Sequence, residues 1–101
     1  MTAPRWPAHW QPEAIAAALP YVGGEDRLDI LVGDPATARS GTRLSGHLDL
    51  RDDGVVIISH DRAGGPGVYP WPLLAGPVLV ITRLRPRRRG VELFRHPGWP
   101  A

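Results

Sequence analysis

The feature that most restricts the fold of this chain is a stretch of strict alternation followed by an Asp-Gly step. Within residues 43–51, apolar or small residues recur at every second position and polar residues lie between them. This pattern predicts an antiparallel strand with one buried and one solvated face. Asp53-Gly54 then leads into an apolar run at residues 55–60, and Asp-Gly between two such runs is the strongest local signal for a β-hairpin.

The position of the turn leaves two registers open for this hairpin. A two-residue turn at Asp53-Gly54 pairs His47 with His60, whereas a three-residue turn with a bulge at Gly54 separates these histidines. Because side chains alternate along a strand, a shift of one residue exchanges the buried and solvated faces. The first register directs Val55, Ile57 and Ser59 to the core, and the second directs Val56, Ile58 and His60.

A short helix is predicted before the first strand. Pro12 suits the first helical position, the alanine-rich stretch after it has high helix propensity, and Pro20 ends the element. Ile15 and Leu19 stand four residues apart and form its predicted apolar face. Two turns are too few for a helix to be stable alone, so it must pack against the rest of the chain.

The other apolar runs predict further strands. Residues 68–74 contain Trp71 between Pro70 and Pro72, which predicts an extended segment at a sheet edge. Residues 86–90 predict the last turn. Strands are predicted at residues 27–32, 78–85 and 91–96, with residues 78–85 central in the sheet.

At 101 residues the chain has the length of one domain. We predict an irregular Pro/Trp-rich arm (1–11) whose Trp6 and Trp10 pack over the body, one domain (12–96) and an irregular tail (97–101). The fold class is mainly β: a short N-terminal helix followed by about five antiparallel strands, in a small barrel or a strongly bent sheet.

This order of elements, over about residues 12–96, resembles that of Sm-like and other SH3-like barrels. The resemblance implies a small barrel. The asparagine expected in the RNA-binding loop of Sm-like proteins is absent, because the chain contains no Asn.

Composition excludes several classes of site. The chain has no Cys, so it forms no disulfide, thiolate zinc site or thiol nucleophile. No signal-like run opens it, and its longest apolar runs are far shorter than the ~20 residues that span a bilayer. We therefore expect a cytoplasmic protein, and we expect no cofactor.

Basic residues gather near the C-terminus. All twelve basic residues are arginine; residues 1–82 carry a net charge of −3 and residues 83–101 a net charge of +5. Absence of Lys and Asn is typical of a G+C-rich bacterial genome, so part of the arginine content reflects codon composition. The cluster lies around the predicted last hairpin and consists of Arg83, Arg85, Arg87, Arg88, Arg89 and Arg95.

Such a cluster predicts an anionic partner, because closely spaced guanidinium groups repel one another unless they meet anions. We expect a non-enzymatic binding module that contacts RNA or single strands through this hairpin, with Phe94 and Trp99 available to stack bases. An acidic protein surface is the alternative partner, as is a second copy of the chain through edge strands. A solvated hairpin without a partner is the third possibility.

Two further groups of residues invite a functional interpretation. Trp71, held between prolines next to Tyr69, is suited to a partner surface or to closing one end of the barrel. In the first register, His47, Asp49 and His60 approach one another and form a remote candidate for a metal-dependent enzyme. The chain lacks the spacing of known metal motifs, so we expect neither a metal site nor catalytic residues.

Overall fold

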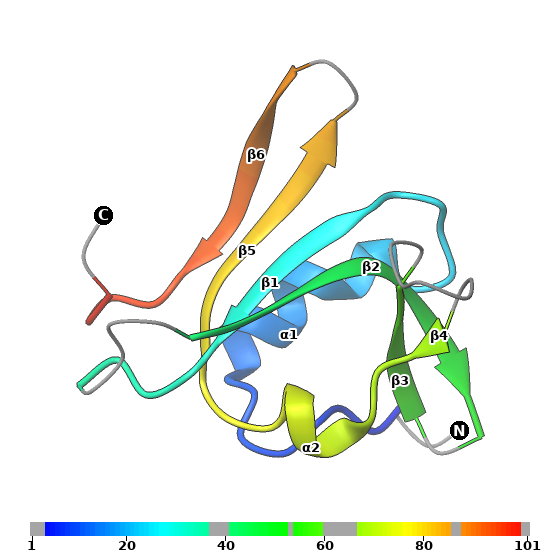
Figure 1. Cartoon of the computed structure of the whole chain (residues 1–101), viewed down its shortest axis with the longest axis horizontal. Coiled ribbons are helices and arrows are strands. Elements are labelled where there is room, and N and C mark those ends of the chain that lie inside the picture. The colour runs from blue at the N-terminus through cyan, green and yellow to red at the C-terminus, as the bar shows by residue number, and fades with distance from the viewer. Residues whose placement is uncertain (1–3, 37–40, 53, 60–66, 86–87, 100–101) are drawn as a thin grey trace.

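The computed structural model describes residues 4–36, 41–52, 54–59, 67–85 and 88–99. In these residues one antiparallel sheet has the strand order β4-β3-β2-β1-β5-β6 (Figure 1). The elements are α1 (Pro12–Ala18), the 3₁₀ turn η1 (Leu19–Tyr21), β1 (Leu28–Val32), β2 (Thr42–Arg51), β3 (Gly54–Ser59), β4 (Gly67–Val68), α2 (Trp71–Leu74), β5 (Val78–Arg85) and β6 (Arg88–Arg95).

The sheet is bent and open. The first half of β2 pairs with β1 and the second half pairs with β3, so β2 passes from one neighbour to the other near Gly46. In the described part of the chain the edge strands β4 and β6 do not pair with each other. The predicted mainly β class is therefore confirmed, and the sheet is not closed into a barrel.

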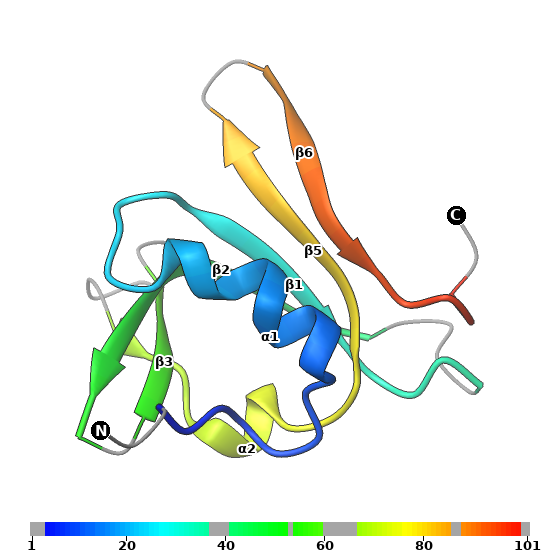
Figure 2. The same cartoon turned by 180° about the vertical axis from the view of Figure 1, so that it is seen from behind.

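Helix α1 lies across one face of the sheet and contacts β5 and β6 (Figure 2). Its buried residues are Ala14 and Ala18, whose small side chains allow the helix to approach the strands closely. The predicted apolar face is wrong at Leu19, which is 51% exposed. The reason is that Leu19 begins the tighter turn η1 and no longer follows the helical period of Ile15.

The strand predictions differ in their outcomes. β1 buries Leu28, Ile30 and Val32 and alternates as predicted, and β5 lies between β1 and β6 as a central strand. The predicted extended segment at residues 68–74 is wrong beyond β4, because Trp71 begins the short helix α2. Proline is compatible with the first turn of a helix, where its missing N–H leaves no hydrogen bond unmade.

Both predicted registers of the β2–β3 hairpin are wrong. Arg51 pairs with Gly54, which leaves only residues 52 and 53 between the strands. Gly54 has φ +123°, and a Cβ atom there would lie 2.5 Å from the carbonyl oxygen of Arg5. This glycine thus permits a close backbone approach instead of forming the turn. The observed pairing differs by two residues from the first register, so Val55, Ile57 and Ser59 share the face of Leu48 as in that register, although all six residues of β3 are buried.

The N-terminal arm packs along α2 and the free edge of β3. The indole N–H of Trp10 donates to the carbonyl oxygen of Leu74 at 2.8 Å, and the backbone N–H of Val55 donates to the carbonyl oxygen of Arg5 at 2.8 Å. The ring of Trp6 lies 5.5 Å from that of Trp10. The prediction that these tryptophans pack over the body is confirmed, since Trp10 is buried and Trp6 packs against the core.

Among the described residues, no helix is long and apolar enough to cross a membrane.

Substitution of Trp10 tests the contribution of the arm to stability. W10F removes the indole N–H and leaves the buried carbonyl of Leu74 without its donor, so we expect the free energy of unfolding to fall by about 1–3 kcal/mol relative to a matched change. The matched change is W6F, because the indole N–H of Trp6 bonds to none of the described residues. Urea unfolding followed by circular dichroism measures both, and equal losses would contradict the role of the hydrogen bond.

Candidate functional site

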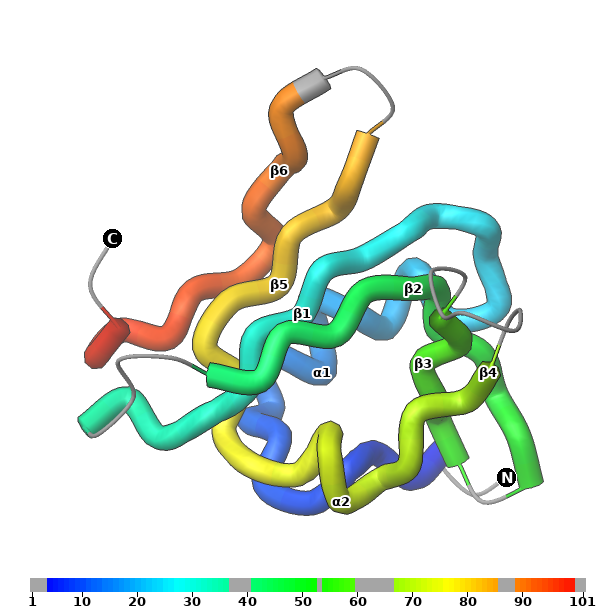
Figure 3. Tube along the Cα trace, viewed as in Figure 1, coloured from blue at the N-terminus to red at the C-terminus, as the bar shows by residue number. Residues whose placement is uncertain are grey.

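The β5–β6 hairpin projects from the body as a two-stranded ribbon (Figure 3). β1 accompanies β5 as far as Arg83, and one more backbone hydrogen bond joins the N–H of Leu84 to the carbonyl oxygen of Arg27 at 2.8 Å. Beyond Leu84, β5 has β6 as its only neighbour among the described residues. We call the part of the hairpin between Leu84 and Val91 the distal ribbon.

The structure places Arg83 at the base of the ribbon, where it is held by the body. Its guanidinium group forms an ion pair with Asp26 at 2.9 Å and a second hydrogen bond from Nε at 3.1 Å. The same group lies 5.7 Å from the centre of the Tyr21 ring. Arg83 therefore fastens β5 to the segment between η1 and β1, and its charge is largely offset within the chain.

Arg95, at the other end of β6, is also paired internally. Its Nη2 and Nε donate to the same carboxylate oxygen of Glu92 at 2.6 and 2.9 Å. This hydrogen bonding raises the pKa of Arg95 above its usual value. Glu92 is the single acidic residue in the basic C-terminal segment, and its charge offsets that of Arg95.

The distal ribbon carries the arginines that the body does not neutralise. Arg85 and Arg89 are exposed, and neither forms an ion pair with a residue that the structure describes. Arg88 belongs to β6, not to a turn at residues 86–90 as predicted, and it pairs in register with Arg85. Arg87 lies outside the described residues. The predicted cluster of six therefore separates into Arg83 and Arg95, which pair with carboxylates, and a distal group.

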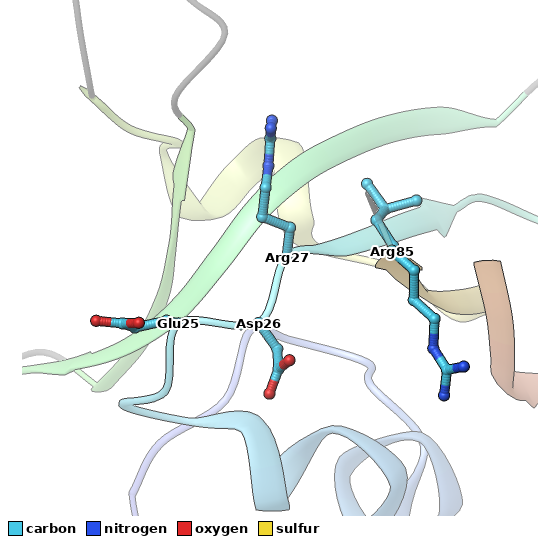
Figure 4. Close-up of a pocket in the computed structure, with 5 residues that line it drawn as sticks. Glu25, Asp26, Arg27 and Arg85 are labelled. Carbon is cyan, nitrogen blue, oxygen red and sulfur yellow. The ribbon is translucent and has the colours of Figure 1, made fainter. Parts of the chain in front are cut away.

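A shallow cavity of about 380 Å³ lies beside the base of the ribbon. Figure 4 shows that its charged side chains, from Glu25, Asp26, Arg27 and Arg85, diverge instead of pointing to a common centre. Asp26 is already occupied by Arg83. Groups that point apart do not form a binding site for a small ligand, so this cavity does not define the function.

The possible metal site does not assemble in the predicted way. His47 pairs with Ile58, not with His60, and Asp49 pairs with Val56. The Asp49 carboxylate accepts a hydrogen bond from Arg51 at 2.9 Å. His60 lies outside the described residues, and within those residues no three His, Asp or Glu side chains form a group that could hold a metal ion.

Trp71 begins α2 and Tyr69 lies between β4 and α2, and α2 is at the end of the molecule opposite the tip of the ribbon (Figure 1). The indole N–H of Trp71 donates to the carbonyl oxygen of Val55 at 3.2 Å, and the Arg5 guanidinium group lies 5.1 Å from the ring centre. The backbone N–H of Tyr69 donates to the carbonyl oxygen of Ile57. Together with the arm, these contacts cover the edge of β3 and give Trp71 a structural role.

Sequence reasoning did not find the cavity of about 450 Å³ at the foot of β6. It is formed by the beginning of α1 and the end of β6, which are about eighty residues apart, and no spacing pattern links them. Its lining residues are Gln11, Glu13, Phe94, Arg95, His96 and Pro97.

The chain matches no protein-family model, and no curated protein or solved structure shows significant similarity to it.

The division between carboxylate-paired and distal arginines is open to a stability measurement. R83M keeps the aliphatic stem but removes the partly exposed ion pair and the contact with Tyr21, so we expect a loss of about 1 kcal/mol in the free energy of unfolding. R85M is the matched control, and we expect a change within about 0.5 kcal/mol. In the R83M background, D26N should cause no further loss. Equal effects of R83M and R85M in urea unfolding would contradict the division.

Proposed function

We propose that this chain is a small, non-enzymatic binding module whose distal ribbon contacts the phosphate backbone of RNA or single-stranded nucleic acid. The observation that carries the proposal is the separation of the arginine cluster. Arg83 and Arg95 are paired with carboxylates, whereas Arg85 and Arg89 of the distal ribbon are exposed and pair with no residue that the structure describes.

The register of the ribbon supports an anionic ligand. Arg85 and Arg88 occupy directly paired positions, and like charges at paired positions destabilise a hairpin. A phosphate group offsets this repulsion, because the planar guanidinium fork binds phosphate oxygens through two hydrogen bonds. Each neutralised phosphate also releases counterions, which adds a favourable and salt-dependent contribution to binding.

The projection of the ribbon suits the same ligand. A phosphate backbone is an extended chain of charges, and a narrow two-stranded ribbon lets charges on both strands approach it without obstruction by the body (Figure 1). The bent sheet below supports the ribbon through β1 and the Asp26–Arg83 ion pair. We also propose that the sheet is an opened relative of SH3-like and Sm-like barrels. Two features support this: a helix precedes the bent strands, and β2 pairs with β1 in its first half and with β3 in its second half.

An acidic protein surface is the second candidate partner, favoured by the unpaired outer edge of β6 in the described sheet. Strand pairing with a second copy of the chain along that edge is less favourable, because arginines on both copies would face one another. A protein partner that docks instead on Tyr69 and Trp71, at the opposite end of the molecule, is distinguished by its response to salt. Phosphate binding weakens steeply as salt rises, whereas binding centred on those aromatic residues responds mildly.

Fluorescence anisotropy with labelled single-stranded RNA tests the proposal. We expect R85S/R89S to weaken binding to all sequences and to reduce the slope of log affinity against log salt by about 1 to 2, since each lost phosphate contact lowers it by about 0.7.

The charge-matched control is R43S/R51S, which removes two arginines from β2, away from the ribbon. This control should bind with the wild-type slope. If both double variants lost RNA affinity equally, the loss would be explained by net charge alone. That result would contradict the ribbon as the contact surface. Absence of wild-type binding at low salt would contradict the function itself.

A further inference from the structure

The cavity at the foot of β6 has the size and lining of a site for a flat organic group. Its volume of about 450 Å³ lies within the range of roughly 300–1,000 Å³ found for small-ligand sites. Phe94 supplies an aromatic ring that is only partly buried, and Pro97 supplies a second apolar surface.

Two of the polar residues around this cavity already have hydrogen-bond partners. The side-chain amide of Gln11 donates to the carbonyl oxygen of Val78 at 2.9 Å and accepts from its N–H at 2.8 Å. Arg95 is held by Glu92. Because both residues already have partners, Glu13 and His96 are the polar side chains left to recognise a ligand.

Glu13 and His96 provide one acceptor and one donor. The backbone N–H of Gly98 donates to Nδ1 of His96 at 2.9 Å, so Nδ1 carries no proton and the ring proton is on Nε2. Glu13 is exposed in the first turn of α1, and it pairs with no residue in the described part of the chain. The cavity thus offers an N–H donor and a carboxylate acceptor beside an aromatic ring.

The alternation of β5 places Arg85 on the same face as Phe94. Phe94 pairs with Ile81, whose side chain is in the core, and Arg85 lies four residues further along β5 than Ile81. Two residues that pair directly in an antiparallel ladder point to the same face of the sheet, and so do residues two positions apart along one strand. At about 3.3 Å per residue, the Arg85 position is roughly 13 Å from that of Ile81 along the strand.

We propose that this cavity holds one unpaired nucleobase of the strand whose phosphates contact the distal ribbon; this inference rests on the proposed function. The base stacks on Phe94, accepts a hydrogen bond from Nε2–H of His96 and donates to the carboxylate of Glu13. Guanine fits this arrangement best, because its edge presents the O6 acceptor beside N–H donors. A base inside a duplex cannot enter, since its faces are stacked and its edge is paired.

Anisotropy with three labelled probes tests the pocket: a short single strand with one central guanine, the same strand with an abasic residue there, and a duplex. Stacking on an aromatic side chain typically changes affinity by about fivefold or more per base. We expect F94L to lose at least that factor for the guanine strand and nothing for the abasic strand. Y69L is the matched control, because Tyr69 is a partly buried aromatic residue remote from the pocket.

E13Q provides a test that does not depend on the core, because Glu13 is exposed. We expect it to abolish the preference for guanine over adenine at the central position without changing the salt slope. Equal wild-type affinity for the guanine and abasic strands, or unchanged binding by both F94L and E13Q, would overturn the pocket. If R85S/R89S still weakens binding in that case, contact by the ribbon survives; if no probe binds the wild type, both proposals fail.

Discussion

The docking of α1 against the beginning of β5 determines which parts of the sheet are covered. The side chain of Gln11 bonds to the backbone of Val78 in both directions, and the adjacent Trp10 bonds to Leu74. These contacts fix the first residues of a two-turn helix over the foot of the last hairpin. Because so short a helix covers only part of a six-stranded sheet, the distal ribbon extends beyond it.

The two sides of the sheet are protected in different ways. On one side the arm, the indole of Trp71 and the backbone of Tyr69 occupy hydrogen-bonding groups along β3. On the other side β6 has no neighbour beyond β5 within the described sheet, and its arginines discourage pairing with another strand. The charges that protect this edge are, in our proposal, also the charges that meet the ligand.

Much of the fold follows from local patterns in the sequence. Alternation in residues 43–51 and the β-branched run in β5 predict the correct strands, and Pro12 predicts the correct start of α1. The hairpin register does not follow, because Gly54 is used for the close approach of Arg5, a contact between residues about fifty positions apart. Of the two faces that the sequence leaves open, the one of the first register faces the core cluster, since a shift of two residues preserves the alternation of side chains.

The candidate site is predictable only as a concentration of charge. Counting charges finds six arginines near the C-terminus, but their division depends on Asp26, which is 57 residues away from Arg83 in the sequence. The pairing of Arg95 with Glu92 is local and could be anticipated from their spacing in a strand. The cavity formed by Glu13, Phe94 and His96 depends on the docking of α1 against β6, which no motif indicates.

The most direct test of the central claim is a titration of the ¹⁵N-labelled protein with a short single-stranded RNA, following the arginine side-chain Nε–H signals by NMR. Our account predicts that the signals of Arg85 and Arg89 shift first. It also predicts that the signal of Arg83, held by Asp26, keeps its position. Shifts confined to Arg5 at the opposite end, or no shift at Arg85 and Arg89, would contradict it.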